Sequence, residues 1–114
     1  MEVLIHKKFY KGEGEDFGKF CKQTYGKPMG KVIARRLEHA RAANCLADLT
    51  VQGFPGRWHW LSGDREGQIS ADLDRMNRLI FEPTMSPAEY HVGGILHEEN
   101  IKEIVLIEVV DTHD

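Results

Sequence analysis

The chain ends in the tetrapeptide Asp111-Thr112-His113-Asp114, which directly follows the apolar run IVLIEVV. Asp111 and His113 are two residues apart, so on an extended strand their side chains point the same way. An aspartate in that position can orient an imidazole and raise its pKa, and histidine titrates nearest to neutral pH. The spacing therefore allows acid–base chemistry at the chain end. The alternative is a polar tail that follows a final strand.

A second candidate for proton transfer is His59, which lies in the segment RWHWL. Alternation along a strand places His59 on the same face as Arg57 and Leu61, and the two tryptophans on the other face. If the strands of His59 and His113 are neighbours, the two imidazoles lie close together. The alternative for His59 is a histidine with satisfied hydrogen bonds on a half-buried sheet face.

Arginine is the side chain best suited to bind phosphate, because the planar guanidinium fits phosphate oxygens. Arg57 precedes His59, Arg65 lies in SGDREG, and Arg78 lies in NRLIF. The alternative for Arg78 is a surface arginine paired to Asp72 or Asp74.

Composition restricts the class of protein. The 114 residues, 41% apolar and 29% charged, suit one compact domain over residues 1–114. No apolar run approaches the roughly 20 residues that span a bilayer, and no secretory signal is visible at the N-terminus. Cys21 and Cys45 match no zinc or CxxC spacing, which indicates reduced thiols and a cytoplasmic protein. His91 and His97 form no ligand pattern, so no metal is expected.

Charge is unevenly distributed along the chain. The net charge is −3, with eleven Lys or Arg against six Asp or Glu in residues 1–57 and four against twelve in residues 58–114. The densest basic stretch, 19–41, can attract a polyanion to one face of the protein. The alternative is an ordinary solvated helix surface.

The elements that would position these residues can be read from periodicity. EVLIHK predicts a first strand, and apolar spacing after Asp16, a suitable N-cap, predicts a helix that stops at Gly26. Pro28 suits the first turn of a second helix, which runs from about 28 to about 43. Two helices joined by so short a break predict an antiparallel hairpin.

The second half of the chain has the pattern of strands. RWHWL, QISADL and NRLIFE have strand length and are separated by turn sequences, and EIVLIEVVD predicts a final strand covered on both faces. Residues 83–100 hold two prolines and two glycines and predict an extended loop before that strand. The order predicts an α+β domain in which the helical hairpin packs on one face of a mixed or antiparallel sheet.

The motifs WHWLSGDREG, NRLIF and the closing DTH together resemble the RelE/ParE toxin superfamily. The resemblance is strongest to the HigB-like branch of type II toxin–antitoxin systems, which has LHxL(K/S)GDRxG, xxRLxF and a final DYH. It covers nearly the whole chain, and the order of elements agrees with a RelE-like fold. The resemblance implies an N-terminal strand and a helical hairpin packed on a curved, mostly antiparallel sheet of four to five strands.

Members of this family are mostly ribosome-dependent mRNA endonucleases that use no metal and no cofactor. The resemblance implies that the substrate's 2′-hydroxyl attacks the scissile phosphate and that side chains move the protons and stabilise the phosphorane. It implies catalytic roles for His59, Arg78, Asp111 and His113. It implies substrate contacts for Arg57, Arg65 and Thr112.

The sequence departs from the family pattern at two positions. Thr112 stands where the family usually has Tyr, which could stack on a base, and Ser62 stands where a Lys is common. Either change predicts altered cleavage rate or base preference, or loss of cleavage. Lys31, Arg35 and Arg36 in the basic stretch are expected to dock on ribosomal RNA.

The expected partners are a helix-turn-helix, HigA-like antitoxin, the ribosome and mRNA, with operator DNA bound only through the antitoxin complex and no membrane. Two alternatives remain open at this point. One is a ParE-like toxin that binds DNA gyrase, and the other is a non-toxic member kept for antitoxin binding and autoregulation.

Overall fold

The computed structural model describes residues 1–9 and 16–111. Its helices are α1 (Phe17–Tyr25) and α2 (Lys27–Ala42). Its strands are β1 (Glu2–Ile5), β2 (His59–Trp60), β3 (Ile69–Asp72), β4 (Asn77–Pro83), β5 (His91–Val92), β6 (Ile95–Leu96) and β7 (Glu103–Asp111). Short 3-10 helices occur at Lys7–Phe9, Leu46–Asp48, Gly63–Arg65, Pro87–Glu89 and Glu98–Asn100.

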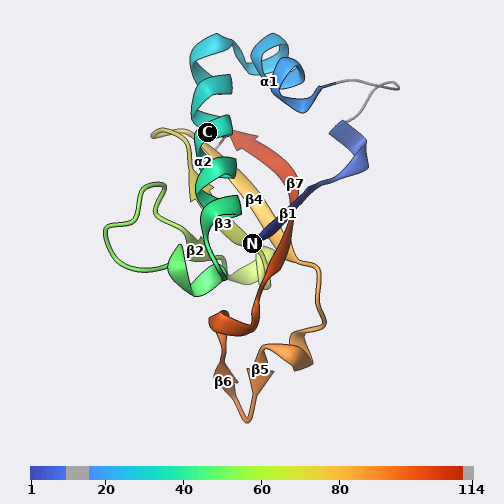
Figure 1. Ribbon diagram of the computed structural model, residues 1–114, viewed down its shortest axis with the longest axis vertical. Helices are drawn as coiled ribbons and strands as arrows, with labels where there is room; N and C mark the ends of the chain where they lie inside the picture. The colour runs from blue at the N-terminus through green and yellow to red at the C-terminus, as the bar shows by residue number, and fades with distance from the viewer. Residues whose placement is uncertain (10–15, 112–114) are drawn as a thin grey trace.

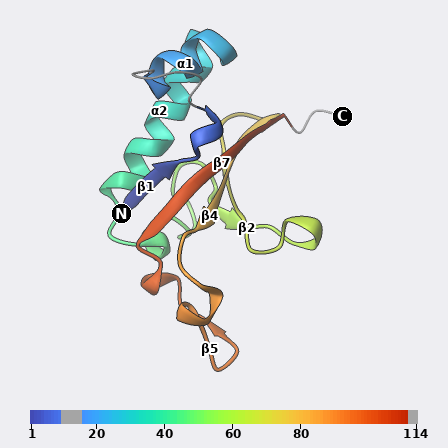
Figure 2. The ribbon, with the colours of Figure 1, turned by 90° about the vertical axis from the view of Figure 1, so that its right-hand side faces the viewer.

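Five strands form one mixed sheet in the order β1-β7-β4-β3-β2 (Figure 1). β1 pairs with β7 in parallel, and the remaining neighbours are antiparallel. Both helices lie on one side of this sheet (Figure 2). The predicted α+β class and the helical hairpin on a mostly antiparallel sheet are confirmed.

The helix boundaries follow from their caps, as the sequence predicted. The Asp16 side chain accepts a hydrogen bond from the Gly18 amide at 2.8 Å, which satisfies one free donor of the first turn of α1. Gly26 ends α1, with its amide donating to the Lys22 carbonyl at 3.1 Å, and Pro28 occupies the first turn of α2. The two helices pack closely, since a Cβ on Gly30 would lie 2.8 Å from the Lys22 side chain.

The hydrophobic core lies between the helices and the sheet face that they cover. Ile33 and Leu37 of α2 face Leu79 and Phe81 of β4, all within one buried cluster. Trp58 is also buried there, with its ring stacked on Phe81 at a centroid distance of 5.1 Å. Each such side chain contributes about 1.5–3 kcal/mol relative to exposure.

The prediction that the last strand is covered on both faces is wrong. In β7, Ile104 and Leu106 are buried, whereas Val105 and Ile107 are partly exposed. The reason is the single helical layer, which covers only one face of the sheet within the described residues (Figure 2). We call the other face the outer face.

Residues 83–100 form more than the predicted loop. They contain the hairpin β5–β6, which projects from the end of the molecule away from α1 (Figure 1). Two contacts tie this segment to the domain: the Trp60 indole donates to Glu98 at 2.8 Å, and the Thr50 hydroxyl donates to the same carboxylate at 3.0 Å. The segment is therefore an ordered extension of the fold beside β2.

Candidate active site

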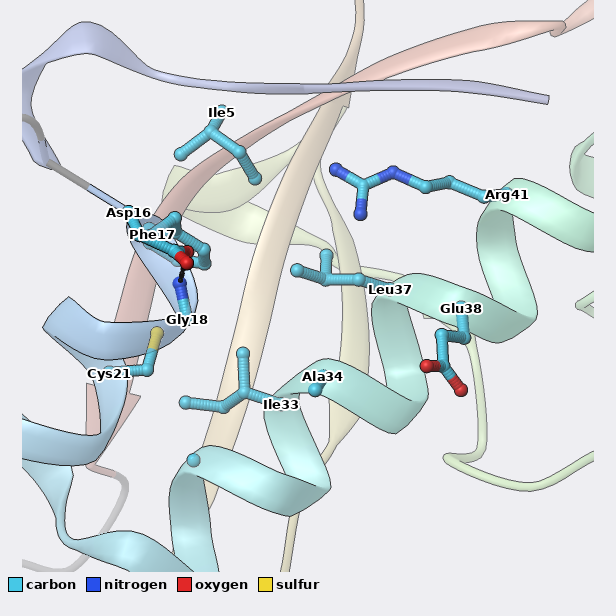
Figure 3. Close-up of a pocket in the computed structure, with 11 residues that line it drawn as sticks. Ile5, Asp16, Phe17, Gly18, Cys21, Ile33, Ala34, Leu37, Glu38 and Arg41 are labelled. Atoms are coloured by element: carbon cyan, nitrogen blue, oxygen red, sulfur yellow. Dashed lines mark hydrogen bonds between the residues drawn. The ribbon is translucent and has the colours of Figure 1, made fainter. Parts of the chain in front are cut away.

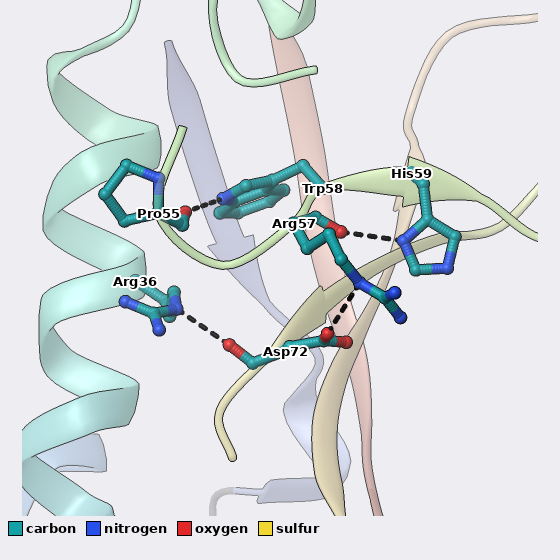
Figure 4. Close-up of polar contacts among 6 residues, drawn as sticks. All are labelled: Arg36, Pro55, Arg57, Trp58, His59 and Asp72. Atoms are coloured by element: carbon teal, nitrogen blue, oxygen red, sulfur yellow. Dashed lines mark hydrogen bonds and ion pairs between the residues drawn. The ribbon is translucent and has the colours of Figure 1, made fainter. Parts of the chain in front are cut away.

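His59 lies on β2, at the edge of the sheet, and pairs with Ser70 of β3. Its Nδ1 lies 2.7 Å from the Arg57 carbonyl oxygen (Figure 4). A carbonyl can only accept, so Nδ1 carries the proton in this contact and Nε2 of the neutral ring keeps its lone pair. The ring is half-buried and presents Nε2 as a proton acceptor. This geometry suits a general base.

The predicted strand over RWHWL is shorter than expected, because Arg57 leaves the extended conformation. Its φ is 47°, in the left-handed region that non-glycine residues rarely adopt, and only His59 and Trp60 pair with β3. The turned backbone aims the Arg57 carbonyl at the imidazole two residues later. The prediction that Arg57 shares a strand face with His59 is therefore wrong. Instead, the Arg57 backbone carbonyl contacts the His59 imidazole directly.

Asp72, at the end of β3, joins three elements around this segment. Its carboxylate pairs with Arg57 Nε at 2.9 Å, and its amide donates to the Gly56 carbonyl at 2.6 Å. Its own carbonyl accepts from Arg36 Nε of α2 at 2.8 Å. Figure 4 shows Asp72 between the two arginines. The exposed Arg57–Asp72 ion pair contributes little stability by itself, so its main effect is to hold the Arg57 side chain in position.

Four arginines converge on a cavity of about 600 Å³, which we call the arginine pocket. They come from a helix, a loop, a turn and a strand: Arg36, Arg57, Arg75 and Arg78. Asp72 and Asp74 also line it, so cations outnumber carboxylates by two to one. Arg36 is half-buried, and this burial, followed by the charge of Arg35, lowers the pKa of its guanidinium. Such a pocket suits an anion.

Arg78 and His59 lie on the same outer face of the sheet. Arg78 on β4 is the cross-strand partner of Asp72 on β3. His59 on β2 is the cross-strand partner of Ser70, which lies two residues before Asp72 on β3. Cross-strand partners and residues two apart share a face. Arg78 Nε and Ser70 Oγ are buried without a hydrogen-bond partner among the described residues. Unpaired buried polar atoms are uncommon in folded proteins.

The end of β7 does not neighbour the strand of His59. Two strands, β4 and β3, separate β7 from β2, which is roughly 14 Å across at 4.8 Å per strand. Asp111 pairs with Asn77, and Val110 pairs with Arg78, so β7 ends beside the arginine pocket. The Asp111 side chain, Thr112 and His113 lie outside the described residues.

Arg65 has a different environment from the other predicted phosphate ligands. It is half-buried on the turn after β2, where it pairs with Glu108 of β7 at 3.0 Å and donates to Gln68 at 2.9 Å. The β7 register shifts between Ile80 and Phe81, which places Glu108 opposite Ile80 on the outer face. Arg65 therefore lies at the outer face with its positive charge compensated by Glu108.

The three basic residues expected to dock on ribosomal RNA are divided by the structure. Lys31 and Arg35 are exposed and four residues apart on α2, so they share a helix face. Arg36 instead turns toward the sheet and lines the arginine pocket. Arg75 was missed, although a turn residue between two predicted hairpin strands was a usable signal, because the turn returns it to the vicinity of Arg78.

A second cavity of about 490 Å³ lies between α1, α2 and β1 (Figure 3). Ile33 and Leu37 form much of its wall, together with the Cys21 thiol. Burial raises the pKa of Cys21 to about 11, so the thiol stays protonated and is a poor nucleophile at neutral pH. This cavity lies on the helical side of the sheet and does not contain the proton-transfer candidates.

Within residues 1–9 and 16–111, neither helix is long and apolar enough to cross a membrane. In the same ranges, no three His, Cys, Asp or Glu side chains gather closely enough to hold a metal ion.

Comparison with known proteins finds a solved structure with the same fold. No protein-family model and no curated protein matches the sequence. Among solved structures, the chain is similar to a YoeB/ParE toxin from Agrobacterium tumefaciens, with a TM-score of 0.57 and 15% sequence identity. The match covers 99% of this chain and 100% of that one. At this identity the likeness establishes the fold, and the predicted RelE-like architecture is confirmed over the length of the domain.

Proposed function

We propose that this chain is the toxin of a type II toxin–antitoxin system and that it cleaves ribosome-bound mRNA without a metal ion. One observation carries the proposal: the imidazole of His59, with Nε2 available as an acceptor, shares the outer face with Arg78, at the border of a pocket of four arginines. A base beside a cationic pocket is what RNA cleavage by the 2′-hydroxyl requires.

In the proposed reaction, His59 Nε2 takes the proton of the 2′-hydroxyl as its oxygen bonds to phosphorus. The bond from phosphorus to the 5′-oxygen then breaks, and that oxygen receives a proton. The products are a 2′,3′-cyclic phosphate and a 5′-hydroxyl. His113 is the proposed proton donor, oriented by Asp111, as the family resemblance implies. The contact from Nδ1 to the Arg57 carbonyl holds the base in the required tautomer.

The arginine pocket supplies the charge that the phosphorane requires. Arg57 and Arg78 are the proposed direct ligands, because Arg57 is exposed and Arg78 lines the pocket from the outer face. Arg75, which lines the same pocket, adds a third cation. Arg36 donates a hydrogen bond to the Asp72 carbonyl, so its proposed role is to position Asp72. Removal of one such cation typically costs 10²–10³-fold in rate.

Mapping mRNA ends by primer extension tests the proposal. After induction without antitoxin, the wild type should give cuts in phase with codons, and His59→Ala and His113→Ala should each abolish them. His6→Ala is the matched control, because His6 is an exposed histidine far from the arginine pocket in sequence. Toxicity that persists in both active-site variants would refute the catalytic assignment. DNA damage without cuts would favour gyrase binding, and absence of growth arrest would favour a non-toxic member.

The ribosome is the proposed docking partner of the exposed α2 surface. Lys31→Glu with Arg35→Glu should reduce co-sedimentation with ribosomes, because phosphate contacts dominate such binding. Arg36 is tested separately, since its loss also disturbs Asp72. Unchanged co-sedimentation of the double variant would exclude this docking face. A helix-turn-helix antitoxin is the proposed inhibitor, and operator DNA would bind through that complex.

A further inference from the structure

A third pocket lies at the edge of the sheet around Trp60, the residue after His59, and plays no part in the proton transfers proposed above. It has a volume of about 470 Å³ and forms between the turn after β2 and the 83–100 extension. Its walls are mainly aromatic and apolar with one acidic group, and they include Trp60, Leu61, Glu66, Tyr90, His91 and Leu96. We call it the aromatic pocket.

Three rings form a continuous strip in this pocket. Trp60 and Tyr90 have ring centroids 5.9 Å apart at 32°, and Tyr90 and His91 have centroids 5.0 Å apart. Tyr90 is only 4% exposed and forms the floor, whereas Trp60 is partly exposed and His91 is exposed. Ring surface therefore remains available for a flat ligand.

The walls are held in place before any ligand arrives. The Trp60 indole is fixed by its hydrogen bond to Glu98 at 2.8 Å. The Tyr90 carbonyl accepts from the His97 amide at 2.6 Å, which closes the base of the β5–β6 hairpin. Ser86 and Glu89 form a capping box at the turn before Tyr90. A site of this rigidity loses little conformational entropy on binding.

We propose that the aromatic pocket binds one unpaired nucleobase of the RNA, next to the scissile phosphate. RNA as the ligand rests on the proposed function. Single-stranded RNA is recognised mainly by stacking unpaired bases on aromatic side chains. Leu61 on the pocket wall is two residues from His59, roughly 7 Å along a strand. The pocket is thus close enough for a base adjoining the phosphate at His59.

The negative charge at the aromatic pocket favours binding of a nucleobase over binding of its phosphate. Glu66 lines the pocket and Glu98 lies behind Trp60, so a phosphate is repelled there and attracted to the arginine pocket. A carboxylate only accepts hydrogen bonds, and it therefore pairs with bases that carry amino groups. Guanine, which offers adjacent N–H groups, should bind best, and uracil, with one imino N–H, should bind worst.

Titration with nucleosides, observed by NMR, tests the pocket without requiring catalysis or a phosphate. Guanosine should shift the indole N–H signal of Trp60, and uridine should bind at least about tenfold more weakly. Trp58 is the internal control, because it is 4% exposed and its indole is bonded to the Pro55 carbonyl at 3.1 Å. No shift at Trp60, or equal shifts at both indoles, would overturn the proposal.

Two variants identify the groups responsible. His91→Ala should weaken guanosine binding about tenfold, whereas Val92→Ala, at an exposed position on the same strand that does not line the pocket, should not change it. Glu66→Gln should reduce the difference between guanosine and uridine. Equal binding by His91→Ala and wild type, or an unchanged preference in Glu66→Gln, would count against the proposed contacts.

The nucleoside titration and the mRNA cleavage assay can fail separately, so their outcomes distinguish the base site from the nuclease. Guanosine binding at Trp60 without mRNA cuts in cells would support the base site and count against the nuclease. Codon-phased cuts without nucleoside binding would support the nuclease and overturn the base site.

Discussion

Gly56 connects the fold to the candidate site, and its substitution by alanine is the most informative single change. Gly56 has φ +97°, and a Cβ there would lie 2.7 Å from Arg36 Nε and 3.1 Å from the Trp58 indole nitrogen. Gly53, three residues earlier, has a similar φ of +89° with no atom within 4 Å of the added Cβ. Gly53→Ala is therefore the matched control for backbone strain.

The difference between the two substitutions can be worked out from these contacts. Both pay the cost of an alanine at positive φ, about 1–2 kcal/mol, which cancels in the comparison. Gly56→Ala must also displace the flexible end of Arg36, which then loses its 2.8 Å hydrogen bond to the Asp72 carbonyl. A hydrogen bond to a charged group is worth about 1.5–3 kcal/mol. For 114 residues, that corresponds to a Tm lower by roughly 6–12 °C than in Gly53→Ala.

Calorimetry and urea unfolding of both variants measure this difference. The double variant Arg36→Ala with Gly56→Ala isolates the contribution of Arg36, because the contact with Arg36 and its hydrogen bond are both absent once Arg36 is shortened, whereas the 3.1 Å approach to the Trp58 indole nitrogen remains. In that background, the extra cost of Gly56→Ala over Gly53→Ala should fall by the about 1.5–3 kcal/mol assigned to the hydrogen bond. If Gly56→Ala alone is no more destabilising than Gly53→Ala, Arg36 does not occupy the position inferred for it.

Three other predictions follow from buried or titrating groups. Backbone hydrogen bonding, first from Met76, lowers the pKa of Asp74. A lowered folded-state pKa adds stability above the unfolded value of about 3.9 and loses it as pH falls further, so the Tm difference between wild type and Asp74→Ala should shrink below about pH 4. Because burial raises the pKa of Cys21 to about 11 and leaves it 1% exposed, a thiol reagent should label Cys45 in the native protein and both cysteines only after unfolding. Leu106→Ala should lower the free energy of unfolding by about 2–5 kcal/mol in urea titrations, since that side chain is fully buried, and a smaller loss would contradict its place in the core.

Elements that depend on neighbouring residues were predictable from the sequence. The start of α1 at Asp16, its end at Gly26 and the position of Pro28 in α2 all follow from local capping and backbone preferences. The apolar periodicity of the two helices correctly marked buried positions such as Phe20 in α1 and Ile33 in α2. His59 was recognised by residue type and motif, and its role stays a prediction.

The arrangement of the candidate active site could not be predicted from local sequence patterns. The contact of His59 with the Arg57 carbonyl requires a left-handed residue within a segment that looks like a strand. Arg36 has the same charge and helical surroundings as Arg35, and only packing against Asp72 distinguishes them. The aromatic pocket joins Trp60 to Tyr90, thirty residues later, and no local pattern links the two.

The sequence by itself determined the helices, their ends, the approximate strands and the residue types suited to RNA chemistry, because these depend on periodicity and on backbone preferences within a few residues. Only the tertiary structure decided which of those residues meet. Insertion of β7 between β1 and β4 separates its end from β2 and brings it to Asn77 and Arg78. Strand order is set by the burial of side chains from distant segments in one core, and four arginines converge on one pocket as its consequence.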